Sequence, residues 1–168
     1  MTVPFNAGQA ATAAAVNSLA PQISVLATTQ TIGSTSPVQV GSFAATVEDG
    51  VTYIGTAWIT IDGGGGGGTA EFRWTGPADP TLLGMGIMSQ QTATADAYQN
   101  ASLESATGYN SGFISTPELA GASYIVQLWI VITPSADGTL ELICANAAGG
   151  SDTFSLGVSY LSVQQQQT

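Results

Sequence analysis

The stretch that decides the fold is VTYIGTAWITI, residues 51–61. Its odd-numbered positions are apolar or small, and threonine fills most of the positions between them. Because successive side chains of a strand point to opposite faces, this period of two predicts a long β-strand with one buried face. The buried face is predicted to hold Val51, Tyr53, Gly55, Ala57, Ile59 and Ile61, and the opposite face Thr52, Ile54, Thr56, Trp58 and Thr60.

The same period recurs along the chain, between turn-forming clusters such as Glu48–Gly50 and Pro134–Gly138. About eight strands at this spacing, with no helical stretch among them, predict an all-β fold, an antiparallel β-sandwich. A chain of 168 residues fits one such domain and can bury a substantial core. Besides 51–61, strands are predicted at Val38–Val47, Thr69–Thr75, Leu82–Met88, Ser123–Thr133, Gly138–Asn146 and Thr153–Val163.

Residues 1–27 differ in composition from everything after them. Pro4 fixes its own φ and biases its predecessor away from helix, which predicts an extended arm at the start. Gln9–Ala20 is rich in alanine and is followed by Pro21, which predicts a short helix. So small a helix needs a surface to lie on, either its own domain or a partner. We therefore divide the chain into an arm with a short helix, 1–27, and a sandwich domain, 28–168.

The predicted strand Ser123–Thr133 is apolar on both faces. A strand in a two-layer sandwich needs only one apolar face, so the N-terminal helix or another subunit must cover the second. Because large exposed apolar patches are uncommon on monomers, we expect a homo-oligomer. The predicted interface residues are Trp58, Ile125, Trp129 and Val131.

Basic side chains are almost absent. The chain has no lysine and no histidine, and Arg73 stands against eleven Asp and Glu, for a net charge of −10. This composition removes the usual general base, the Schiff-base amine and the imidazole metal ligand. It also disfavours nucleic acid and anionic lipid, which are bound through Lys and Arg. We expect a surface or assembly protein, not an enzyme, with no catalytic residue.

Three motifs that could carry chemistry have simpler interpretations. Gly63–Gly68 lacks a following Lys-Ser/Thr and opens into a predicted strand, so it is interpreted as a flexible hairpin tip and not a phosphate loop. The lone Cys144 sits in an apolar stretch, which predicts a buried, inert thiol. Arg73 is expected to pair with a carboxylate such as Glu71 or Glu141, or to stack on an aromatic ring. No cofactor is predicted.

The carboxylates suggest two further sites, neither of which the spacing favours. Glu48, Asp49 and Asp62 could surround a calcium ion, but carboxylates at turns are more often solvated turn formers, so no metal site is predicted. Glycoside hydrolysis needs only two acids across a cleft, and nothing singles out a pair.

No stretch is long and apolar enough for a membrane span, and the N-terminus lacks a positive region of a secretory signal.

Several stretches resemble a jelly-roll domain common in virion proteins of tailed phages of actinobacteria. They are GSFAATVEDGVTY (41–53), TAEFRWTGPA (69–78), ADGTLELICANA (136–147) and GVSYLSV (157–163). PFNAGQ (4–9) with VNSLAP (16–21) is similar to the N-terminal segment that often precedes that domain. The six-glycine tip and the near absence of basic residues depart from the pattern.

The resemblance implies a jelly-roll-like sandwich in a capsid decoration protein, a head fibre or a minor tail protein, commonly trimeric. We expect a decoration protein on the outer capsid surface of the virion, made in the host cytoplasm, which binds the major capsid protein as a homotrimer. Its partner-binding residues would be Pro4, Phe5, Val16 and Leu19. The alternative is a minor tail or receptor-binding protein that stacks sugars on Trp58, Trp74, Tyr98 or Tyr109.

Overall fold

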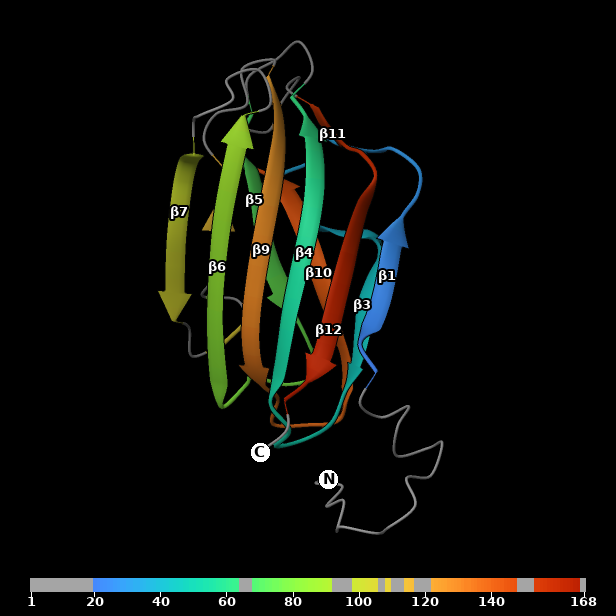
Figure 1. Cartoon of the computed structure of the whole chain (residues 1–168), viewed down its shortest axis with the longest axis vertical. Coiled ribbons are helices and arrows are strands. Elements are labelled where there is room, and N and C mark those ends of the chain that lie inside the picture. The colour runs from blue at the N-terminus through green and yellow to red at the C-terminus, as the bar shows by residue number, and fades with distance from the viewer. Residues whose placement is uncertain are drawn as a thin grey trace, which may run out of the picture.

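A computed structural model describes residues 20–63, 68–91, 98–105, 108–109, 114–116, 122–147 and 153–166. In this part the chain is all-β, with no helix (Figure 1). Side chains are not described for β7 and β8. The strands are β1 (Gln22–Leu26), β2 (Gln30–Ile32), β3 (Val38–Val47), β4 (Tyr53–Asp62), β5 (Ala70–Thr75), β6 (Leu82–Gln91), β7 (Tyr98–Ser105), β8 (Ile114–Ser115), β9 (Ser123–Thr133), β10 (Gly138–Asn146), β11 (Phe154–Leu156) and β12 (Ser159–Gln165).

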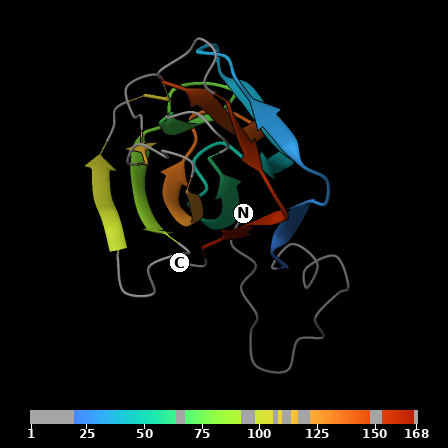
Figure 2. The same cartoon turned by 90° about the horizontal axis from the view of Figure 1, so that it is seen from above.

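The strands form two antiparallel sheets, which confirms the predicted all-β sandwich. Sheet A has the order β1-β12-β4-β9-β6-β7, with β11 pairing both β4 and β2. Sheet B has the order β3-β10-β5-β8. In Figure 1, β6, β9, β4 and β12 lie in front of β5, β10 and β3, and Figure 2 gives the view from above.

Four strand pairs are nested along the chain. β1 pairs with β12, β3 with β10, β4 with β9, and β5 with β8. The first and third pairs belong to sheet A and the other two to sheet B. The chain is thus folded back on itself like one long hairpin whose successive pairs alternate between the sheets.

The predicted strands agree with observed strands in position and, for three of them, in both bounds. β3, β9 and β10 have the predicted bounds residue for residue, whereas the strand predicted at Thr153–Val163 is divided at Gly157 and Val158 into β11 and β12. The prediction missed β1, β2, β7 and β8. β1 lies within the segment 1–27 assigned to the arm and helix, yet it pairs with β12 as part of sheet A.

The core lies between the sheets and follows the predicted alternation. On β4 the buried side chains include Tyr53, Ala57, Ile59 and Ile61. On β9 the even-numbered residues 124–132 are buried, while their neighbours face the other way. Sheet B contributes large side chains, such as Phe72 and Trp74, with 1% and 2% of their surface exposed. Burying such apolar surface is the main stabilising term of the fold.

Cys144 is fully buried, as predicted. Burial in this apolar setting raises the pKa of its thiol far above the ordinary value, with a smaller contribution from the charge of Glu71. The side chain therefore stays a protonated thiol near neutral pH, and it behaves as a small apolar group.

The predicted helix at Gln9–Ala20 lies outside the described residues, apart from Ala20 itself, and the predicted partner-binding residues Pro4, Phe5, Val16 and Leu19 lie outside them entirely. Within the described part of the chain, no helix has the length and hydrophobicity to cross a membrane.

Candidate interaction face

The outer face of sheet A is the side turned away from sheet B. Alternate residues of its strands point there because their neighbours are buried in the core. Asp62, at the end of β4, is the single charged residue among those described on the five strands that form this face. They are Ile23 and Val25 on β1; Tyr160, Ser162 and Gln164 on β12; Ile54, Thr56, Trp58, Thr60 and Asp62 on β4; Ser123, Ile125, Gln127, Trp129, Val131 and Thr133 on β9; and Leu82, Gly84, Gly86, Met88 and Gln90 on β6.

Exposed apolar side chains gather on this face. Trp58 and Tyr160 keep 39% and 42% of their surface exposed, and Ile23 on β1 keeps 65%. Every large apolar side chain that is exposed in the described residues lies on or beside this face, except Val38 on β3. Large apolar patches of this kind mark interaction sites.

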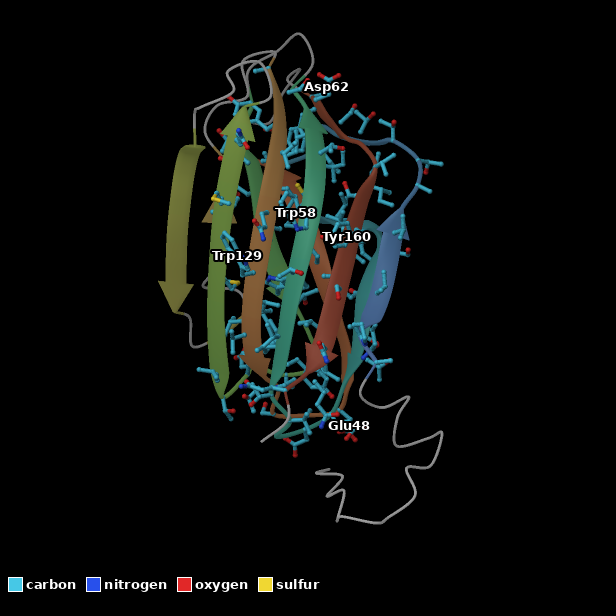
Figure 3. All side chains as sticks on the ribbon, in the orientation of Figure 1. Glu48, Trp58, Asp62, Trp129 and Tyr160 are labelled. Carbon is cyan, nitrogen blue, oxygen red and sulfur yellow. The ribbon has the colours of Figure 1, made fainter. Side chains whose placement is uncertain are left out.

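A row of paired residues crosses the face and holds two of its three aromatic residues, Trp58 and Tyr160, on neighbouring strands. Val25 is opposite Tyr160, Tyr160 is opposite Trp58, and Trp58 is opposite Gln127. Figure 3 labels Trp58 and Tyr160 on the adjacent strands β4 and β12. Residues directly opposite each other on neighbouring strands have their Cβ atoms close together, so Trp58 and Tyr160 place two aromatic side chains next to each other, here called the aromatic platform.

Beside this platform is a shallow apolar cavity of about 430 Å³. Two of its three side-chain hydroxyls are already engaged: the Thr60 hydroxyl donates to the Val158 carbonyl at 3.1 Å, and the Ser159 hydroxyl donates to the Gly157 carbonyl at 2.8 Å. The third belongs to Tyr160. The cavity therefore suits an apolar group. It is lined by Val25, Trp58, Ile59, Thr60, Ile125, Val158, Ser159 and Tyr160.

All four predicted interface residues lie on this face. Trp58 and Ile125 line the cavity. Trp129 is half-buried and lies opposite Thr56 on β4 and opposite Gly86 on β6. Val131 is exposed opposite Ile54, which forms a second apolar pair.

A second cavity, of about 370 Å³, adjoins the Ile54 end of the face. Amides and hydroxyls of β4 and β12 line it, in contrast to the apolar cavity. Its lining is Ile54, Gly55, Thr56, Ser162, Gln164, Gln165 and Gln166.

Most of the described carboxylates lie elsewhere. At the end of the sandwich where β4 begins, the Asp49 amide donates to the Asp137 carboxylate at 2.8 Å, and the Ser135 hydroxyl donates to the Asp79 carbonyl at 2.6 Å. Glu48 marks this end in Figure 3, and Asp62 marks the opposite end. Burial raises the pKa of Tyr53 there. The hydrogen bond from the Glu48 amide to the Tyr53 hydroxyl opposes this rise, and the charges of Glu48 and Asp137 add smaller increases.

This separation excludes the calcium arrangement considered from the sequence, since Glu48 and Asp62 lie at opposite ends of β4. In the part of the chain that the structure describes, no three acidic, Cys or His side chains gather as a metal site requires.

The outer face of sheet B is smaller and carries charge. Glu71 and Arg73 lie on it, on alternate positions of β5. Glu141 of β10 lies opposite Thr75, so its carboxylate shares this face with Arg73, as the predicted pairing requires.

Two of the aromatic residues proposed for sugar stacking are not available for it. Trp74 and Tyr109 are buried in the core, with 2% and 5% of their surface exposed, so that prediction was wrong for both. The side chain of Tyr98 lies outside the description. The sequence prediction also missed Tyr160 and Val25 as members of the face, although QISVL at 22–26 already shows a period of two.

No protein-family model matches this chain. No sequence among the curated proteins matches it either. Among solved structures, a chain from the crystal structure of accessory secretory protein 1, 2 and 3 in Streptococcus pneumoniae is similar, with 9% sequence identity over 88% of this chain and 90% of that chain. The TM-score is 0.27, which does not establish a shared fold.

Proposed function

We propose that this chain is a non-enzymatic structural protein of a tailed-phage virion. In this proposal it is a capsid decoration protein that forms a homotrimer through the outer face of sheet A. It binds the shell of the major capsid protein through its N-terminal segment. The virion assignment follows from the resemblance of residues 41–53, 69–78, 136–147 and 157–163 to virion jelly rolls.

The observation that carries the proposal is the nearly uncharged outer face of sheet A. Copies of a chain with a net charge of −10 repel one another wherever carboxylates meet. The end of the sandwich that holds Glu48 and the outer face of sheet B both carry carboxylates. The outer face of sheet A combines low charge with exposed apolar side chains, and it is the surface on which copies can associate by burial.

The nested strand pairs support a jelly-roll assignment for the sandwich. A jelly roll is a double sheet of eight strands in which a long folded-back hairpin is wound across both layers. The pairs β1–β12, β3–β10, β4–β9 and β5–β8 alternate between the sheets in that way. In this assignment β6 and β7 extend sheet A beyond β9.

Attachment to the shell is assigned to the residues before β1. Because β1 starts at Gln22 and pairs with β12, a truncation after residue 27 would remove a strand of sheet A. The test is therefore removal of residues 1–19 alone, with occupancy measured on shells of the major capsid protein. We expect binding to the shell to be lost while the truncated protein keeps its fold and its oligomeric state. Full occupancy by the truncated protein would show that the anchor lies elsewhere.

A receptor-binding role is the second candidate, and the two adjoining cavities favour it. Trp58 and Tyr160 offer an aromatic surface, and Gln164 and Ser162 in the neighbouring cavity offer neutral hydrogen-bonding groups. Neutral glycans would fit such a surface better than anionic ones. Binding to host cell-wall glycans that is lost in Trp58→Ser would support this role, and the absence of any glycan binding would remove it.

A further inference from the structure

The outer edge of β3, at one side of sheet B, has no neighbouring strand within the part of the chain that the structure describes, and side chains from elsewhere in the chain lie along it. In the described residues β3 pairs with β10 on one side and with no strand on the other. An uncovered edge of this kind is a template for pairing with another chain. The strands β1 and β2 of sheet A run past it, and β1 lies beside β3 in Figure 1.

Side chains from β1 take over the hydrogen bonds that a neighbouring strand would make. The Thr46 amide donates to Gln22 Oε1, and Gln22 Nε2 donates to the Thr46 carbonyl, both at 2.8 Å. Two residues further along β1, the Ser24 hydroxyl donates to the Ala44 carbonyl at 3.2 Å. The spacing of two residues on both strands reproduces the step of an antiparallel ladder.

At the other end of the β3 edge, a glutamine side chain again hydrogen-bonds to the backbone in place of a neighbouring strand. The Gly41 amide donates to Gln30 Oε1, and Gln30 Nε2 donates to the Gln39 carbonyl, both at 2.8 Å. A primary amide carries one acceptor and two donors, so a glutamine can mimic a backbone unit.

Between these two positions β3 is irregular. Its register with β10 shifts between the pairs formed by Glu141 and Ile143. Gly41 has φ +52°, and a Cβ there would lie 2.7 Å from Leu26 Cδ1, so the bend needs glycine and lets Leu26 close over it. Bulges and covered edges are two of the devices by which natural sheets avoid edge-to-edge pairing.

We propose that Gln22, Ser24 and Gln30 form a side-chain cap that blocks strand addition at β3. The cap keeps a second copy from pairing its own β3 there, which restricts self-association to the outer face of sheet A. This role rests on the proposed assembly function, because a virion holds many copies close together. Without the cap, the β3 edges of two copies would join antiparallel about a two-fold axis, and because each copy also associates through the outer face of sheet A in the proposed function, such contacts would link the closed oligomers into larger aggregates.

The test compares the full-length protein with the variant Gln22→Ala/Gln30→Ala. Its control is Gln166→Ala, which removes an exposed glutamine side chain outside the cap. We expect the double variant to form species larger than the wild type in light scattering, and the control to keep the wild-type mass. Amide hydrogen exchange should be faster at Gly41 and Thr46, since the cap provides the acceptors for these two amides.

Adding Val38→Lys to the double variant should restore the wild-type mass, because an exposed lysine on an edge strand opposes pairing. If the double variant folds and keeps the wild-type mass, the cap does not block strand pairing at β3, and the proposal is refuted. If its large species persist with Val38→Lys, they form through another surface, and the proposal is also refuted. Should the double variant not fold, Gln30→Ala alone carries the same test at Gly41. A monomeric wild type would refute the trimer and leave this comparison intact.

Discussion

The two outer faces of this sandwich are built from strands of the same kind but differ in what they expose. The outer face of sheet A presents Trp58, Tyr160 and other apolar side chains with Asp62 alone carrying charge among its described residues. The outer face of sheet B carries Glu71, Arg73 and Glu141. A face meant for water is normally charged or polar. The difference shows which face is suited to a protein neighbour and which to solvent.

The largest expected effect separates two tryptophans, Trp74 and Trp58. Both stand in strands, so the sequence around them looks similar, but their side chains face different surroundings. Trp74 faces the core with 2% of its surface exposed, and Trp58 lies on the outer face of sheet A. We expect Trp74→Ala to lower the free energy of unfolding by about 3–5 kcal/mol, because it leaves a large cavity. Denaturant unfolding measures this loss.

Trp58→Ala should behave differently. Because in the proposed function Trp58 makes an association contact and no core contact, the effect of this variant on the unfolding midpoint should vanish as the protein is diluted below the dissociation constant of the oligomer. An equally large and concentration-independent loss in both variants would contradict the distinction between the faces.

A smaller effect is expected at alkaline pH, and it arises from the core. Burial raises the pKa values of Cys144 and Tyr53 above their ordinary values of 9.0 and 10.0. A group whose pKa is higher in the folded state stabilises the fold fully below its unfolded pKa and less as the pH rises beyond it. Stability should therefore be level near neutral pH and fall above about pH 9. Cys144→Ala should show a shallower fall, and an unchanged profile would contradict the account.

The smallest effect is expected from salt. In the proposed function, association through the outer face of sheet A and attachment through an uncharged N-terminal segment would both depend on apolar burial. Screening shortens to about 3 Å at 1 M salt, which weakens ion pairs and leaves or strengthens apolar contact. Occupancy on shells and oligomer mass should therefore change little from low salt to about 1 M. Release of most of the protein would show that carboxylates such as Glu48 pair with basic partner groups.

The sequence predicted the long strands because the burial of one face enforces a period of two along them. β3, β9 and β10 match residue for residue, and the predicted interface residues Trp58, Ile125, Trp129 and Val131 all lie on one face. The shorter strands β1, β2 and β8 were harder to predict. In β1 the positions that face sheet B include polar residues such as Gln22, which hydrogen-bond to β3. The apolar alternation that would predict a strand is therefore weaker there.

The place of Tyr160 in the aromatic platform could not be predicted from its own strand. Tyr160 joins the platform because it lies opposite Trp58, and residues about a hundred positions apart are brought together only by the order of strands in the sheet. Likewise, Asp62 and Glu48 look close in sequence, but the length of β4 separates them.

The most direct test of the central claim is the mass of the protein in solution after a charge is placed on each outer face. Val131→Glu puts a carboxylate on the outer face of sheet A, and Thr139→Glu puts one at an exposed position on β10 of sheet B. Light scattering should give three times the chain mass of 16.9 kDa for the wild type and for Thr139→Glu, and the single-chain mass for Val131→Glu. A wild type that is monomeric at micromolar concentration, or a Val131→Glu variant that keeps the full mass, would contradict the assignment of this face to self-association.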